Sequence, residues 1–372
     1  MARTHILGFP RIGAQRELPG ALASFWRGDT DEAALQDVAH TLRQRHWAHQ
    51  QQTLDFLCAG DFSLYDPMLD HTALLGATPA RFGFDAAPLA LPHLFSLARG
   101  TTTQPAMAAA QWFDTHYHYV VPELSANTPF RLDAGPLCDH VAEALRTRHA
   151  VKPVLIGPIT YLWLARQAGE ADARLLHLPA LTAVYAQILD RLHALGIEWV
   201  QMDEPALATD LPPHWLDAFE GAYGELGRRG PKLLLASYFA STADLAPRLS
   251  RLPVAGFHID LACAPAQAYR WLDHLPAGAV LSAGVVDGRN VWRNDLRRTL
   301  ATLQPMHDAL GDRLWIAPSC SLLHVPVSLA GEQGLDHEVR SWLAFATEKL
   351  DEVCTLGRAL NEGAAAVADA LD

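Results

Sequence analysis

Short apolar runs alternate with stretches of helical spacing along the chain. Candidate strands lie at residues 5–9, 61–65, 151–156, 196–203, 232–237, 254–260, 278–283 and 313–318. Helical patterns include residues 32–56, 178–195 and 213–228. The apolar runs do not alternate with polar residues, which is typical of parallel strands buried on both faces. Eight such strands with helical crossovers predict an α/β fold of the (β/α)8 or TIM barrel type.

A doubly wound open sheet is the alternative architecture, but no glycine-rich turn follows the first candidate strand. Residues 75–150 are mostly helical or loop-like in pattern, which predicts a helical insertion between the second and third strands. We therefore expect a single barrel over residues 1–360, followed by a tail or linker stub at residues 361–372.

One apolar run, residues 196–207 with the sequence GIEWVQMDEPAL, ends abruptly in two acids and a proline. Pro205 cannot donate to a strand ladder, so the strand should stop near Asp203. Adjacent strand residues point to opposite faces, so Asp203 and Glu204 cannot converge on one substrate. We expect Asp203 to face the barrel mouth and Glu204 to face a neighbouring strand or helix.

Polar residues follow most of the predicted strands, at the end where barrel enzymes carry their sites. These residues are Asp66, Asp203, Glu204, Ser237, Asp260, Asp287, Ser319 and Cys320. For any one of them alone, a loop residue or a helix N-cap is the commoner explanation. Their repetition across successive strands favours a functional site.

Composition narrows the class of protein. The formal net charge of −12 argues against a nucleic-acid surface, which needs clustered cations. No apolar run is long enough to span a membrane, and no signal-peptide pattern opens the sequence. The five cysteines are widely spaced and odd in number, which argues against a disulfide framework. We expect a cytoplasmic protein.

Three groups of residues could carry chemistry, each with a plainer explanation. His258, Asp260, Cys263, Cys320 and His324 are potential zinc ligands, although buried structural histidines and inert thiols are commoner. Arg11 and Arg16 could clamp a carboxylate, or be solvated loop charges. The aromatic run at residues 112–119 could stack a flat heterocycle, although subdomain core is the commoner role.

Several ordered motifs resemble one family. The segments LGFPRIGAQREL (7–18), WFDTHYHY (112–119), KPVLIGP (152–158), WVQMDEPA (199–206), AGVVDGRNVW (283–292) and SCSLLH (319–324) all resemble the N-terminal half of cobalamin-independent methionine synthase. The match runs from about residue 4 to residue 362. That family has two (β/α)8 barrels. The resemblance implies that this chain helps bind 5-methyltetrahydrofolate polyglutamate, whereas a C-terminal barrel, in cis or in trans, carries zinc and homocysteine.

Residue by residue, the family's folate-binding tetrapeptide falls on Arg16, Glu17, Leu18 and Pro19. The last position is usually lysine in the family, and here it is proline. A second lysine used for the polyglutamate tail aligns with Gln111. Each exposed ion pair is worth about 0.2–1 kcal/mol. The two missing cations therefore predict weaker binding of the tail.

The resemblance also implies that this barrel holds no zinc. The positions duplicated from the zinc ligands are Leu235, Ser237, Asp260 and Cys320, and two potential ligands are too few for a catalytic zinc. Asp203 aligns with an aspartate that contacts the homocysteine amino group in the other barrel, and would be a relic here. We expect no cofactor on this chain and no catalytic residue except the weak candidate Asp203.

Three hypotheses follow for the function. The first is the folate-side half of a methionine synthase, incomplete alone for methyl transfer. The second is a non-catalytic module that docks onto a separate catalytic barrel. The third is an independent barrel enzyme with a repurposed site around Asp203, Asp260, Cys320 and His324.

Overall fold

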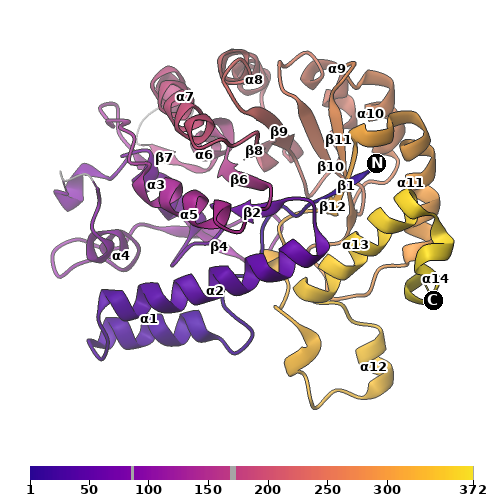
Figure 1. The fold of residues 1–372 in the computed structure, drawn as a ribbon. Coiled ribbons are helices and arrows are strands. Elements are labelled where there is room, and N and C mark those ends of the chain that lie inside the picture. The colour runs from indigo at the N-terminus through magenta and orange to yellow at the C-terminus, as the bar shows by residue number, and fades with distance from the viewer. Residues whose placement is uncertain (85–87, 168–172, 372) are drawn as a thin grey trace.

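Eight parallel strands curl into a barrel with helices around it in the computed structural model, which describes residues 1–84, 88–167 and 173–371 (Figure 1). The barrel strands are β1 (Arg3–Thr4), β2 (Leu57–Ala59), β6 (Val151–Ile156), β8 (Trp199–Asp203), β9 (Lys232–Ala236), β10 (Gly256–Asp260), β11 (Val280–Val286) and β12 (Leu314–Pro318). Their order is β1-β12-β11-β10-β9-β8-β6-β2. The backbone N–H of Asp55 donates to Thr4 O at 3.1 Å, which joins the two ends of the sheet. The predicted (β/α)8 barrel is confirmed.

Helices cover the outside of this barrel or belong to segments that project from it (Figure 1). They are α1 (Glu17–Arg27), α2 (Glu32–Thr53), α3 (Pro67–Leu74), α4 (Leu91–Arg99), α5 (Gly135–Leu145), α6 (Pro158–Leu164), α7 (Leu178–Ala194), α8 (Pro213–Leu226), α9 (Ala246–Leu249), α10 (Gln267–His274), α11 (Leu296–Leu310), α12 (His337–Ser341), α13 (Ala346–Glu362) and α14 (Ala368–Leu371). The late helix α13 packs against the early helix α2, which closes the outer layer. No helix in the described part of the chain combines the length and apolarity needed to cross a membrane.

Most strand boundaries match the sequence pattern, and two do not. Strand β6 has the predicted bounds, and β8 ends at Asp203 as expected. The first strand is residues 3–4 rather than 5–9, and the second is Leu57–Ala59 rather than residues 61–65. Gly60 has φ of +80°, and a Cβ there would lie 3.1 Å from Val154 O. The strand therefore ends before this glycine, and residues 61–65 belong to the loop above it.

The insertion between the second and third barrel strands is mixed. It contains α3, α4 and α5, as the helical pattern predicted, and also an antiparallel hairpin of β3 (Ala109–Gln111) and β4 (His118–Val120). A short parallel pair, β5 (Glu123–Leu124) with β7 (Arg166–Gln167), follows the hairpin. The hairpin carries the aromatic run of residues 112–119. Two of its side chains, Trp112 and Tyr117, lie at the barrel mouth.

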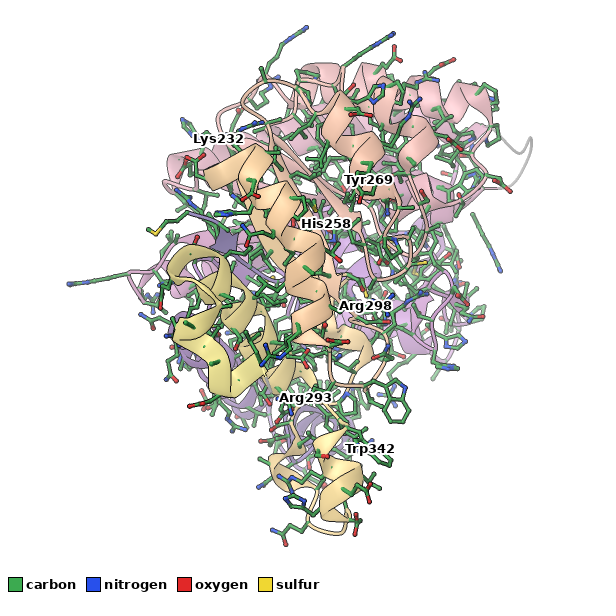
Figure 2. All side chains as sticks on the ribbon, turned by 90° about the vertical axis from the view of Figure 1, so that its right-hand side faces the viewer. Lys232, His258, Tyr269, Arg293, Arg298 and Trp342 are labelled. Carbon is green, nitrogen blue, oxygen red and sulfur yellow. The ribbon has the colours of Figure 1, made fainter. Side chains whose placement is uncertain are left out.

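Two segments near the C-terminal end differ in their packing. After α13, Val367 and Leu371 are buried in the main core. The segment that holds α12 instead projects from the barrel and carries the half-exposed Trp342 (Figures 1 and 2). It is tied to the barrel by the hydrogen bond from Arg293 N to Trp342 O at 2.8 Å.

The barrel interior is layered. At the amino ends of the strands, Trp315 packs on Phe56 and Trp199 with ring centroids 4.7 and 4.6 Å apart. Trp199, Gln201 and Asp203 alternate along β8, so all three point the same way. An apolar bottom layer is thus followed by polar residues towards the mouth, where barrel interiors usually carry branched apolar side chains.

Candidate functional site at the barrel mouth

The strand-end residues surround a small cavity of about 70 Å³ at the barrel mouth. Its lining includes Asp61, Asp66, Asp203, Tyr238 and His324 from the carboxyl ends of barrel strands and the loops after them. Trp112 and Tyr117 of the hairpin segment also line the cavity. Ligand pockets usually have volumes of roughly 300–1,000 Å³. The cavity therefore has room for water or a very small group, and none for a folate.

The two acids that end β8 face different environments, as the sequence predicted. Asp203 lines the cavity, and Glu204 is fully buried beneath α6. The Glu204 carboxylate accepts hydrogen bonds from Ile159 N at 3.1 Å, Thr160 N at 2.7 Å and Tyr223 OH at 2.8 Å. A Cβ on Gly157 would lie 2.2 Å from this carboxylate, so the position needs glycine. Burial raises the pKa of Glu204 to about 7, although these hydrogen bonds oppose the shift. Glu204 is a structural cap on α6.

Asp203 is part of a buried polar network. Gln201 Nε2 donates to Asp203 Oδ1 at 2.6 Å, and Tyr238 OH donates to Asp203 Oδ2 at 3.2 Å. Lys152 Nζ donates to Gln201 Oε1 and, at 3.3 Å, to Ile6 O. Burial raises the pKa of Asp203 to about 7, against the hydrogen bonds and the Lys152 charge. Burial also lowers the pKa of Lys152. A proton can be shared among these hydrogen-bonded groups. Each of them already has a hydrogen-bond partner within the protein.

A second polar chain crosses the barrel interior. His5 Nε2 lies 2.7 Å from Ser282 Oγ, and His258 Nδ1 lies 2.8 Å from the same oxygen. His258 Nε2 lies 3.1 Å from Ser319 O. Burial holds the pKa of His5 well below its usual value and lowers that of His258 to about 4. Both rings are neutral at pH 7, and both nitrogens of His258 are used, so His258 is not a free metal ligand.

The positions that the resemblance relates to zinc ligands do not fit a metal. Leu235 is buried and apolar, and the buried Ser237 hydroxyl has no hydrogen-bond partner among the described residues. Both oxygens of Asp260 accept backbone hydrogen bonds, from Cys263 N at 2.8 Å and Phe239 N at 3.1 Å. Cys320 is fully buried, which raises the pKa of its thiol. Within residues 1–84, 88–167 and 173–371, no three His, Cys, Asp or Glu side chains are grouped so that they could hold a metal ion.

The predicted folate tetrapeptide opens α1, outside the mouth cavity. Arg16 is exposed and adopts a left-handed conformation with φ of 60°. Glu17 pairs with Arg45 at 2.7 Å. Partial burial alone would raise the pKa of Glu17, but the hydrogen bonds from Arg45 and from backbone N–H groups lower it below its usual value. Leu18 is buried against α2 and acts as core. Pro19 lies in the first helical turn, where its missing N–H does no harm. Arg16 is therefore the exposed member of the motif.

Gln111 lies on the exposed strand β3, and its Nε2 donates to Thr115 O at 2.6 Å. This amide therefore stabilises the hairpin turn. No hydrogen bond or ion pair between described residues joins Gln111 to the Arg16–Pro19 segment. The structure leaves the role of both segments in folate binding a prediction.

Arg11 and the aromatic run form one unit at the mouth. The Arg11 guanidinium lies 5.6 Å from the Tyr117 ring centroid and donates to Tyr65 O. Tyr117 OH donates to Asp66, which also accepts from Leu69 N and Val120 N. Arg11 therefore anchors the hairpin, whereas Arg16 is exposed. The predicted two-arginine clamp has no support in these contacts.

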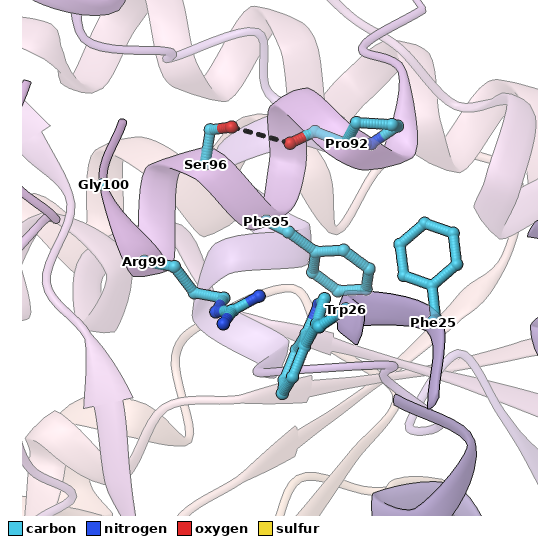
Figure 3. Close-up of a pocket in the computed structure, with 7 residues that line it drawn as sticks. All are labelled: Phe25, Trp26, Pro92, Phe95, Ser96, Arg99 and Gly100. Carbon is cyan, nitrogen blue, oxygen red and sulfur yellow. Dashed lines mark hydrogen bonds between the residues drawn. The ribbon is translucent and has the colours of Figure 1, made fainter. Parts of the chain in front are cut away.

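A separate open groove of about 360 Å³ lies between the end of α1 and α4 (Figure 3). Phe95 and Trp26 meet edge to face, 5.6 Å apart, and the Arg99 guanidinium covers the Trp26 ring at 4.1 Å. The groove is at the opposite end of α1 from Arg16. Its aromatic rings mainly pack on one another, so it extends the small core of Leu18 and Leu22 to the surface.

Sequence reasoning missed Lys152 and Gln201. A lysine inside an apolar strand is a signal for a buried polar network, and Gln201 precedes Asp203 by two residues on the same strand face. It also missed His5 and Ser282, which meet His258 across strands distant in the sequence. Their pairing depends on the register of β10 and β11, in which His258 faces Ser282.

The fold and the site at the barrel mouth define an α/β barrel whose interior holds networks of hydrogen-bonded polar side chains. The family described as "Cobalamin-independent synthase, N-terminal domain" matches residues 3–311. A 5-methyltetrahydropteroyltriglutamate–homocysteine methyltransferase of Paraburkholderia phytofirmans is 58% identical over 369 residues, covering 99% of this chain and 48% of the relative. One of Acidithiobacillus ferrooxidans is 51% identical over 400 residues, covering 100% of this chain and 51% of the relative.

Solved structures agree on the fold. A putative vitamin-B12 independent methionine synthase of Listeria monocytogenes superposes with a TM-score of 0.63 at 11% identity, covering 97% of this chain and 98% of that one. A B12-independent methionine synthase of Shewanella gives 0.58 at 14% identity, with 92% and 91% coverage. The chain belongs to the cobalamin-independent methionine synthase family, as a member of its N-terminal domain family. It spans about half the length of the curated relatives that it matches.

Proposed function

We propose that this chain is the folate-side half of a methionine synthase. In this proposal it helps bind 5-methyltetrahydrofolate polyglutamate, and a second, zinc-carrying barrel, in cis or in trans, transfers the methyl group to homocysteine. The observation that carries the proposal is the family match over residues 3–311, together with relatives named for this reaction of which the chain spans about half.

The chemistry of the mouth supports a non-catalytic role for this barrel. A cavity of about 70 Å³ cannot enclose a folate, and the positions related to zinc ligands include Leu235 and the poor ligand Ser237. These facts also weigh against an independent enzyme built around Asp203, Asp260, Cys320 and His324. The exposed Arg16 guanidinium remains available for a glutamate carboxylate, because Arg presents a planar fork to such groups.

Calorimetry with the mono- and triglutamate forms of 5-methyltetrahydrofolate tests the proposed binding. We expect the purified chain to bind the triglutamate, and Arg16→Ala to weaken that binding more than binding of the monoglutamate. Arg298→Ala is the matched control, because Arg298 is an exposed arginine on the distant helix α11. Equal affinities of the Arg16→Ala and Arg298→Ala variants for the triglutamate would remove Arg16 from the site.

A non-catalytic docking module is the second candidate. It is favoured by Pro19 and Gln111, which supply no cation, and by the use of the Gln111 amide within its own hairpin. The same calorimetry separates the two functions. A chain that binds neither folate form is a docking module.

A further inference from the structure

A chamber of about 390 Å³ lies on the flank of the barrel, next to the mouth cavity, with which it shares the lining residues Gly60 and His71. Its walls come from α2, α3, α5, β6 and the segments 60–64 and 88–94. Most of the lining is apolar, and its larger side chains are Phe62, Leu74, Leu89, Leu94, Leu137 and Leu155. Its volume falls within the range of ligand pockets, roughly 300–1,000 Å³. The chamber therefore fits a compact apolar molecule.

The charged groups that line the chamber are mainly acidic. Glu32, Asp70 and Asp133 contribute carboxylates, and among the described lining residues the one permanent cation is Arg43. Its guanidinium is already held by Glu143 through hydrogen bonds of 2.7 and 3.0 Å. The lining histidines, His71 and His140, are neutral at pH 7, because burial lowers both pKa values to about 4. An anionic ligand would find no free counter-charge.

Among the carboxyl groups that line the chamber, Asp70 is the candidate for binding a ligand. It lies on α3, and the charge of Arg11 acts on both Asp70 and Asp66, although no ion pair between described residues joins Arg11 to either carboxylate. Asp66 is satisfied by Tyr117 OH and two backbone N–H groups, whereas the described hydrogen-bond partner of Asp70 is the Ser63 hydroxyl. Burial raises the pKa of Asp70 to about 7. A carboxyl in an apolar pocket with a shifted pKa is a common mark of a binding site.

We propose that the chamber binds a small apolar amine, with the ammonium group on Asp70 and the hydrocarbon body among the leucine side chains. A protonated amine supplies the counter-charge that Asp70 lacks, and a charge-assisted hydrogen bond to a carboxylate is stronger than a neutral one. A metal ion is disfavoured, because no three His, Cys, Asp or Glu side chains in the described part of the chain are grouped so that they could hold one. This site is independent of the proposed folate function.

Three matched probes test the proposal on the full chain by calorimetry: 2-naphthylmethylamine, 2-naphthylmethanol and 2-naphthoate. We expect the amine to bind about tenfold or more tightly than the alcohol, and the acid to bind more weakly than both. Asp70→Asn keeps the shape of the side chain and should abolish the preference for the amine while the alcohol still binds. Asp273→Asn, the same change at an exposed acid on the distant helix α10, should leave the preference unchanged.

Ala73→Phe places a ring in the chamber and should weaken amine and alcohol alike, with the thermal midpoint of each variant as the check on folding. If Ala73→Phe does not fold, the comparison of Asp70→Asn with Asp273→Asn still decides. Three results would overturn the proposal: no binding of the amine, binding of the acid as tight as that of the amine, or an unchanged amine preference in Asp70→Asn.

Discussion

Gln201 donates a 2.6 Å hydrogen bond to the carboxylate of Asp203, two residues further along the same buried strand. The other end of the Gln201 amide accepts from Lys152. A neutral amide thus separates a buried ammonium from a buried carboxyl. This arrangement explains how Asp203 is buried at the barrel mouth, because both of its oxygens accept hydrogen bonds from protein groups.

Stability should depend on pH through Asp203. Burial raises its folded pKa to about 7, above an unfolded value of about 3.9, so the folded state binds the proton more tightly. The contribution of Asp203 to the free energy of unfolding is therefore full below pH 4 and is lost as the pH rises to 7. Asp203→Asn removes this loss. As the pH rises from 5 to 7, we expect the free energy of unfolding of the variant, measured with urea, to increase by about 1–2 kcal/mol relative to that of the native chain. A constant difference across that range would contradict the assignment.

Lys152 should be essential for stability although it touches no predicted ligand. Its side chain is fully buried, and its removal leaves Gln201 Oε1 and Ile6 O without their donor. We expect Lys152→Met to lower the free energy of unfolding by about 3–5 kcal/mol. Lys232→Met is the control, because Lys232 is exposed and pairs with Glu198 at 2.9 Å; its cost should stay within about 1 kcal/mol. Similar costs for the two variants would refute the buried network.

The tautomers of His5 and His258 follow from a count of protons. Two neutral rings and the Ser282 hydroxyl supply three protons for four hydrogen-bond contacts. We expect the longest contact, His5 Nδ1 to Ile6 O at 3.3 Å, to be the one without a proton. His258 Nε2–H then donates to Ser319 O, Ser282 to His258 Nδ1, and His5 Nε2–H to Ser282. Nitrogen-15 NMR at pH 7 should show the Nε2–H tautomer for both residues. An Nδ1–H form of either ring would contradict this order.

The lysines missing from the proposed folate motif give a gain-of-function prediction. Pro19→Lys with Gln111→Lys should strengthen binding of the triglutamate, because each exposed ion pair contributes about 0.2–1 kcal/mol. The combined effect is about two- to thirtyfold in affinity, and the monoglutamate should be unaffected. Calorimetry of both ligands measures it. An equal gain for mono- and triglutamate would show that the two positions do not meet the tail.

The sequence predicted the fold better than the boundaries of its first strands. Val151–Ile156 is apolar except for Lys152 and is followed by a Gly-Pro stop, and the sequence predicts its bounds correctly. The second strand was placed after Gly60 because residues 61–65 are rich in aromatic and apolar side chains. The positive φ of Gly60 and its contact with β6 end the strand earlier, and neither is visible in a hydrophobicity pattern.

The site was less predictable for a physical reason. The orientation of Asp203 followed from the end of its strand, and the separation of Glu204 followed from alternation. The partners of Asp203 come from other strands, and His5, Ser282 and His258 meet only through the register of the closed sheet. Contacts between distant strands depend on that register, which a single sequence does not supply.

A turnover assay with methyltetrahydrofolate triglutamate, homocysteine and zinc tests the central claim most directly. The purified chain is assayed alone and then with the separately produced second half of the Paraburkholderia phytofirmans relative. We predict no methionine from the chain alone and methionine formation when the second polypeptide is added. Robust turnover by this chain without a second polypeptide would contradict the account.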